Sequence, residues 1–218
     1  GGFSGYDEQR VRARSDEVVA RHYRHVGSRL ADLRRSDGGF DLLILGGSDA
    51  HIAGALEELP PDVSEVLAGS FTIDPGTMTP ATVLAHATDV AKVWESENDQ
   101  QLVAELFDTA ASGGAAVLGL EGVCIAANRR AVDVLFVQVG HAVPGSTCTE
   151  CGWVSCRMES DCSVCGSVLS RVPDLVDRLG ESVRSAGGTV RHILSEGPLA
   201  EVEVGARLRY SIPMVDPT

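Results

Sequence analysis

The chain has 218 residues, and 44% of them are hydrophobic, so it can bury a folded core and is not a disordered linker. Its 31 acidic residues outnumber its 18 basic ones, and the net charge of −13 excludes a general nucleic-acid coat protein or a membrane-surface binder. No run approaches the roughly 18 apolar residues of a membrane span, and no signal peptide is evident. We therefore expect a cytoplasmic protein with neither membrane nor DNA as a partner.

The positive charge is concentrated near the N-terminus. Residues 1–35 hold eight arginines against five acids, a local charge of +3, which leaves −16 for the rest of the chain. After a glycine-rich start, apolar residues recur at helical spacing and predict a long amphipathic helix over residues 7–35. Its other face carries Arg10, Arg12 and Arg14 among others. Any contact with nucleic acid is expected at this basic end.

The pattern in the rest of the first half predicts an α/β unit. The apolar run at residues 40–45 predicts a strand covered on both faces, and Gly46-Gly47-Ser48-Asp49 turns it into a short helix that ends before Pro60. A second strand is expected over residues 66–73 and a long helix over residues 80–111. Ser112-Gly113-Gly114 then marks a predicted boundary between domains at residues 1–112 and 113–218.

The second half begins a new apolar pattern. It predicts, in chain order, a helix over residues 120–130, a strand over 132–139, a cysteine-rich excursion over about 145–168, a helix over 172–186 and strands over 189–194 and 206–212. The expected fold class is α/β, with two domains that each have a mixed sheet flanked by helices. The second domain also contains a small zinc knuckle.

Four of the six cysteines lie in two Cys-x-x-Cys-Gly pairs, which predict a tetrahedral zinc site. Ten residues separate the pairs, and the glycine after each pair suits the tight turn that a metal knuckle requires. With four protein ligands the zinc would be structural rather than catalytic. Cys156 lies between the pairs, so a swapped ligand or a disulfide is an alternative, whereas Cys124 is expected to be a buried thiol. The predicted ligands are Cys148, Cys151, Cys162 and Cys165.

Several segments resemble one known family. Gly1-Gly2-x-Ser4 before an arginine-rich helix resembles the middle domain of the archaeal and eukaryotic class 1 peptide release factor and Pelota family. Residues 119–124 leading into the strand at 131–137 are similar to the entry of that family's third domain. Archaeal members carry paired Cys-x-x-Cys-Gly knuckles after this strand. Residues 205–210 resemble the family's last strand, so the likeness runs through nearly the whole chain.

One position departs from the release-factor pattern. Where release factors have a glutamine that organises the hydrolytic water, this sequence has Phe3, whose phenyl ring can neither donate nor accept that hydrogen bond. The start resembles more closely a bacterial branch of Balon-like ribosome hibernation factors. The resemblance implies a hibernation or stalled-ribosome factor that does not hydrolyse peptidyl-tRNA. An active peptidyl-tRNA hydrolase, in release or rescue, is the alternative.

The resemblance also implies roles and partners. The loop at Gly1, Gly2, Phe3 and Ser4 would reach towards the peptidyl transferase centre, with no residue assigned as catalytic. Arg10, Arg12 and Arg14 would contact ribosomal RNA. The third domain would meet a translational GTPase similar to elongation factor Tu.

An alternative of another class is a nucleotide- or small-molecule-binding enzyme. The strand that turns through Gly46 and Gly47 into a helix is typical of such units, but the spaced glycine fingerprint and a phosphate-loop lysine are absent. His22 and His25, three residues apart on the first helix, could share a metal, although solvated positions explain them more simply. The tight turn likewise explains the two glycines without a nucleotide.

Overall fold

The computed structural model describes residues 4–74, 76, 78–140 and 142–213. The chain divides into two compact units, residues 1–95 and 96–218, and the division falls within a long helix, α4 (Pro80–Ala111), rather than at the glycines that follow it. Helix α4 continues through the division because it has no glycine or proline after its first residue to interrupt it. The assignment of the units to the family's middle and third domains stays a prediction.

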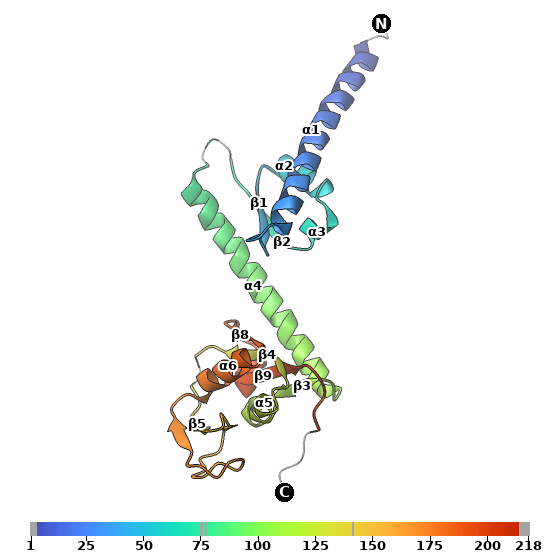
Figure 1. Ribbon diagram of the computed structural model, residues 1–218. Helices are drawn as coiled ribbons and strands as arrows, with labels where there is room; N and C mark the ends of the chain where they lie inside the picture. The colour runs from blue at the N-terminus through green and yellow to red at the C-terminus, as the bar shows by residue number, and fades with distance from the viewer. Residues whose placement is uncertain (1–3, 75, 77, 141, 214–218) are drawn as a thin grey trace. The chain divides into compact units, whose positions relative to one another are not determined.

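The first unit is built on two parallel strands, β1 (Leu43–Gly47) and β2 (Leu67–Thr72) (Figure 1). The helices of this unit are α1 (Ser4–Arg35), α2 (Asp49–Glu57), α3 (Pro61–Ser64) and the beginning of α4. Strand β1 is only half-buried, where we expected a strand covered on both faces. The short helix α3, which has Pro61 at its first position, was not predicted.

Close contacts hold α1 against α2. Gly54 of α2 lies under the ring of Tyr23, because a Cβ atom there would be 2.8 Å from Tyr23 Cε2. Two ion pairs also hold α1 in place: Arg24 pairs with Glu58 at 3.3 Å, and Arg35 pairs with Asp62 at 2.9 Å. The part of α1 nearest its C-terminus is therefore anchored to this unit by both packing and charge.

The second unit contains a mixed four-stranded sheet in the order β3-β9-β4-β8. Strands β4 and β8 are parallel, and β9 is antiparallel to its neighbours β3 and β4. Their bounds are β3 (Ala116–Leu118), β4 (Val132–Gln138), β8 (Thr189–Ile193) and β9 (Val204–Leu208). The three-residue strand β3 was not predicted, because it is too short to show an alternating pattern.

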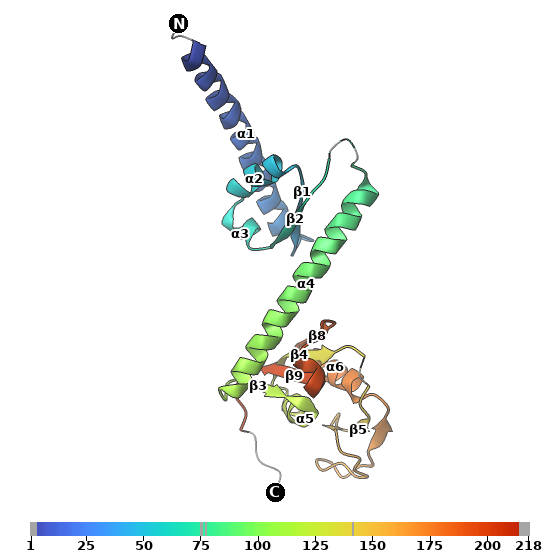
Figure 2. The same ribbon diagram turned by 180° about the vertical axis from the view of Figure 1, so that it is seen from behind.

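Helices cover both faces of this sheet. Apolar residues of α5 (Gly119–Asn128) and α6 (Leu175–Ser185) form one core cluster with the sheet. The end of α4 and the short helix α7 (Leu199–Val202) form a second cluster with it, in which Leu106 packs with Phe136, Ile193 and Leu199. Figure 2 shows the second unit from behind, with α5, α6 and the end of α4 around the sheet. The three layers confirm the predicted α/β class, but the prediction of a mixed sheet in each unit was wrong for the first, whose two strands are parallel.

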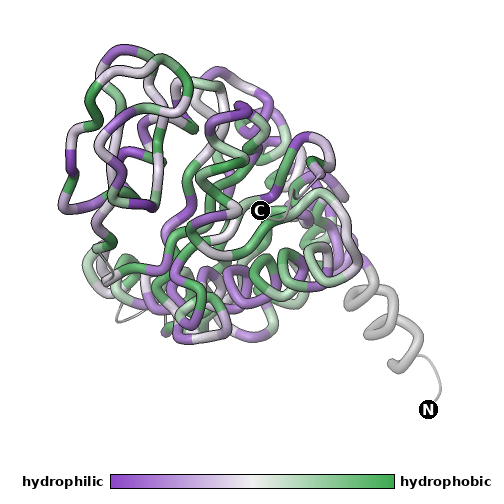
Figure 3. Tube along the Cα trace, turned by 90° about the horizontal axis from the view of Figure 1, so that it is seen from below, coloured by the Kyte–Doolittle hydropathy of each residue, from purple (hydrophilic) through white to green (hydrophobic). Residues whose placement is uncertain are grey.

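Helix α6 shows why these helices dock. Leu175, Leu179 and Val183 are buried at helical spacing, while Arg178 and Glu181 are exposed on the other side. Figure 3 shows the described part of the chain coloured by hydropathy, with hydrophobic and hydrophilic residues interspersed along it. The side chain of Asp174 caps the first turn by accepting a hydrogen bond from the N–H of Val176 at 2.9 Å.

A third, three-stranded sheet lies between β4 and α6 in sequence. Its strands are β5 (Gly145–Thr147), β6 (Val154–Ser155) and β7 (Ser170–Val172), in the order β6-β5-β7. We call residues 145–172 the metal lobe, because both cysteine pairs lie in it. No helix in the described part of the chain is both long and apolar enough to cross a membrane.

Candidate metal centre and the neighbouring groove

Four cysteine sulfurs meet in the metal lobe, as the spacing predicted. Cys148 Sγ lies 3.4 Å from Cys165 Sγ, and Cys151 Sγ lies 3.5 Å from Cys162 Sγ. All four sulfurs lie within 4.8 Å of one another. Zinc–sulfur bonds of about 2.3 Å in a tetrahedron would place the sulfurs roughly 3.8 Å apart, so the group fits one zinc ion.

The two cysteine pairs have the same backbone geometry. The N–H of Gly152 donates to the carbonyl of Cys148 at 3.0 Å, and the N–H of Gly166 donates to the carbonyl of Cys162 at 2.9 Å. Both glycines have a φ of +76°, in the left-handed region that other residues adopt with strain. Each Cys-x-x-Cys-Gly segment is thus a turn that aims two sulfurs at one point, and the glycine makes the turn possible.

Burial differs between the first and second cysteine of each pair. Cys148 and Cys162 are 3% exposed and pack with Leu169 and Trp153, whereas Cys151 and Cys165 are exposed. The apolar core of this lobe is small, so a bound metal would supply much of the free energy that keeps it folded. Four thiolates fill the tetrahedral coordination of zinc, so its chemistry would be structural.

The thiols of this group have unequal proton affinities. Hydrogen bonds from the side chain and backbone of Ser167 lower the pKa of Cys165 to about 6, which favours its thiolate at neutral pH. The backbone of Trp153 lowers the pKa of Cys151, but desolvation and hydrogen bonds with the other three sulfurs outweigh it and raise the value to about 12. Metal binding must release the remaining protons, so affinity for zinc should fall as pH falls.

Side-chain interactions attach the metal lobe to α5. The side chain of Asn128 donates to the Val154 carbonyl at 2.7 Å and accepts from the Val154 N–H at 2.9 Å. Arg157 pairs with Glu121 at 2.7 Å. The sequence did not reveal these contacts, because their partners are 26 and 36 residues apart and carry no motif.

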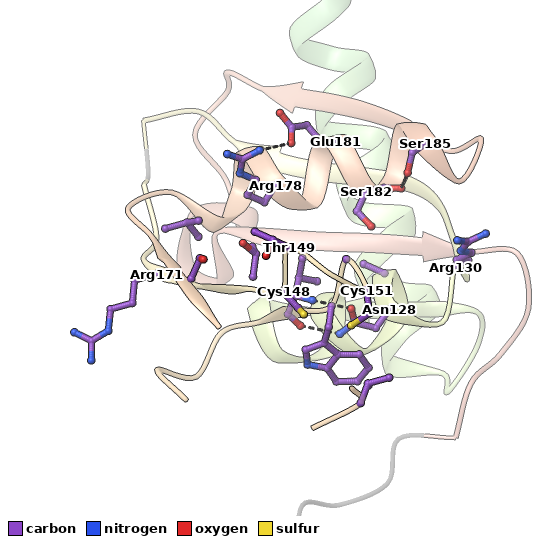
Figure 4. Close-up of a pocket in the computed structure, with 18 residues that line it drawn as sticks. Asn128, Arg130, Cys148, Thr149, Cys151, Arg171, Arg178, Glu181, Ser182 and Ser185 are labelled. Atoms are coloured by element: carbon purple, nitrogen blue, oxygen red, sulfur yellow. Dashed lines mark hydrogen bonds and ion pairs between the residues drawn. The ribbon is translucent and has the colours of Figure 1, made fainter. Parts of the chain in front are cut away.

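A groove of about 860 Å³ runs between the metal lobe and α6. Figure 4 shows Arg178 and Glu181 of α6 on one side of it and Cys148 and Cys151 on the other; the two α6 side chains pair at 2.7 Å. Arg130 and Arg171 also line the groove. A four-thiolate zinc centre has a formal charge of −2, which offsets these arginines, so the groove is not simply an anion site.

The other predicted site residues lie at the start of the chain. Gly1, Gly2 and Phe3 are outside the described residues, and Ser4 is the first residue of α1. Arg10 and Arg14 are one helical turn apart on α1, with Arg12 between them. Arg14 is exposed, while the side chains of Arg10 and Arg12 are outside the description. Their role in RNA binding stays a prediction.

The features behind the alternative hypotheses have structural explanations. The ring of Phe71 lies over Gly46, where any Cβ atom would collide with it, so packing between β1 and β2 requires this glycine. His22 lies beside Tyr23, with ring centroids 5.7 Å apart. Among the described residues only the four cysteines form a group of three or more potential metal ligands, and neither His22 nor His25 belongs to it.

Comparison with known proteins shows what this chain and its fold are similar to. Residues 1–92 match the family described as bacterial archaeo-eukaryotic release factor family 10. The fold is similar to that of Dom34 from S. cerevisiae, a translation termination-like factor, with 13% identity, a TM-score of 0.54 and coverage of 90% of this chain and 53% of that one. No curated protein matches the sequence.

The fold is also similar to archaeal Pelota in a model of ribosome-bound Pelota and ABCE1. The identity is 16% and the TM-score 0.54, and the match covers 88% of this chain and 50% of that one. This chain therefore spans about half the length of both Dom34 and Pelota.

Proposed function

We propose that this chain is part of a translation factor of the release-factor and Pelota family that binds the ribosome without hydrolysing peptidyl-tRNA. The family supports the first half of the proposal, and the match to residues 1–92 includes the glycine loop and α1. Phe3 carries the second half, because it stands where release factors have the glutamine that orders the attacking water. Such a factor would occupy idle or stalled ribosomes in the cytoplasm.

The basic helix supports contact with ribosomal RNA. Arg14 is exposed on α1, in the segment whose charge of +3 contrasts with the −16 of the rest. Arginines that contact phosphates displace bound counterions, so this end would favour RNA even though the whole chain is acidic. We therefore assign RNA binding to Arg10, Arg12 and Arg14, and we expect the acidic body to face protein.

The partner proteins are inferred from the family. The Dom34 structure is described as that of a factor interacting with Hbs1, and the Pelota model contains ABCE1 and a ribosome. By analogy, we assign to the second unit the binding of a translational GTPase similar to elongation factor Tu. The metal lobe would give this unit a rigid surface, with zinc held by the two knuckles and taking no part in a reaction.

Co-sedimentation of the full-length protein with bacterial ribosomes tests the binding half of the proposal. Binding should occur at low salt and weaken as salt rises, because phosphate contacts release counterions. Addition of elongation factor Tu with GTP should increase the bound fraction. No co-sedimentation under either condition would refute the proposal and leave only the fold and the metal centre.

A further inference from the structure

Two cysteines outside the metal centre lie together at the junction between α5 and the metal lobe. Cys124 is on α5 and 4% exposed, and the half-buried Cys156 directly follows β6. Both line a cavity of about 400 Å³ that is distinct from the groove beside α6. Neither belongs to the metal-binding group, which argues against Cys156 as a swapped ligand.

The two cysteines are close neighbours. Cys156 packs against the core cluster that contains Cys124, and the groups of Cys156 are near enough to change the pKa of the Cys124 thiol. Burial, reinforced by the neighbouring Cys156, raises the pKa of Cys124 to about 12, so Cys124 is protonated at neutral pH. An oxidant that enters the cavity would therefore react first at Cys156, the more exposed of the two.

We propose that Cys124 and Cys156 are a redox site that hydrogen peroxide converts to a disulfide while the other four cysteines hold the metal. The Cys156 thiolate attacks one peroxide oxygen, the O–O bond breaks, and the released hydroxide takes a proton to become water. This leaves a sulfenic acid on Cys156. The Cys124 sulfur then attacks the Cys156 sulfur, and the hydroxyl leaves with the Cys124 proton as a second water. Both thiols are oxidised, and one peroxide is reduced to two waters.

Contacts on either side of Cys156 restrict its movement relative to Cys124. Asn128 fixes Val154 through two hydrogen bonds, and the Arg157 to Glu121 pair closes the same junction from the other side of Cys156. Little conformational freedom remains to be lost when the S–S bond forms. The disulfide would join α5 covalently to the metal lobe, so the lobe would stay attached if its metal were lost. This inference does not depend on the proposed function.

The test uses the zinc-loaded full chain treated with an equimolar amount of hydrogen peroxide. After alkylation of the remaining thiols, intact-mass measurement should show the loss of two hydrogen atoms, and peptide mapping should show residues 124 and 156 cross-linked. Zinc content should be unchanged. In Cys124→Ala, Cys156 should instead stay as a sulfenic acid that dimedone traps. In Cys156→Ser, neither the disulfide nor a dimedone adduct should form.

Three results would overturn the proposal. The first is a disulfide between Cys156 and a knuckle cysteine accompanied by release of zinc. The second is oxidation of Cys156 to sulfinic acid while Cys124 is present and unmodified. The third is survival of both thiols when excess peroxide has already released the zinc, since the metal centre would then be the more reactive site.

Discussion

The side chain of Asn128 pairs with the backbone of Val154 as a neighbouring strand would, donating to its carbonyl at 2.7 Å and accepting from its N–H at 2.9 Å. Strand β6 has only two residues and pairs with β5 on one side. The Asn128 amide supplies hydrogen bonds on the Val154 backbone that a further strand would otherwise provide. The metal lobe is thus joined to α5 by a side-chain amide that makes the two hydrogen bonds of a paired backbone.

Asn128→Asp should therefore destabilise the chain. The carboxylate still accepts from the Val154 N–H, but it cannot donate to the carbonyl and places two acceptors together. We expect the free energy of unfolding to fall by about 1–3 kcal/mol, measured by urea denaturation. Asn98→Ala on α4 is the control, because Asn98 makes no side-chain hydrogen bond within the described residues. Equal stability of Asn128→Asp and the unsubstituted chain would show that this pairing contributes nothing.

Metal removal should loosen the lobe selectively. Cys162→Ser removes a buried ligand, so purified protein should lose the single zinc ion per chain that a four-thiolate site holds. Proteolysis should then cut first within residues 145–172, while the four-stranded sheet stays intact. Cys156→Ser should keep its zinc, because Cys156 is not in the metal group. Zinc lost equally from both variants would place Cys156 among the ligands.

The buried thiol of Cys124 should make stability depend on alkaline pH. Its folded pKa of about 12 is above the ordinary value of 9.0, so the native state holds this proton more tightly than the unfolded chain does. The corresponding stability is complete below pH 9 and is lost as pH rises towards and through 12. At pH 10 the loss should be about 1.4 kcal/mol relative to pH 7.

Urea denaturation of the unsubstituted chain and of Cys124→Ala at both pH values checks this expectation. The substituted chain should lose less stability between pH 7 and pH 10, since it lacks the titrating group. Identical losses in the two chains would mean that Cys124 does not titrate abnormally.

Replacement of the α1 arginines should weaken ribosome binding. Changing Arg10, Arg12 and Arg14 to alanine should lower co-sedimentation and flatten its dependence on salt, by roughly one unit of slope for each arginine that contacts a phosphate. Arg171→Ala removes one positive charge from the groove of the second unit and should leave the slope unchanged. If the triple variant binds as well as the parent at every salt concentration, α1 is not the RNA-binding element.

Local patterns in the sequence predicted much of this structure. The bounds of α4 follow from a proline start and an uninterrupted helical stretch, and the metal group follows from two short cysteine spacings that each close within one turn. Contacts between distant residues could not be predicted, because spacing does not encode them. The Asn128 pairing with Val154 and the approach of Cys124 to Cys156 depend on how α5 meets the metal lobe, and Phe71 reaches Gly46 only through strand pairing.

Hydrolysis of labelled peptidyl-tRNA on bacterial ribosomes tests the central claim most directly. The assay compares the full-length protein with its Phe3→Gln variant, which restores the side chain that release factors use, and ribosome binding is measured in the same samples. The account predicts that both proteins bind and that the parent releases no peptide. Release of peptide by the parent at the rate of a release factor would contradict it, because the protein would then be a peptidyl-tRNA hydrolase in spite of Phe3.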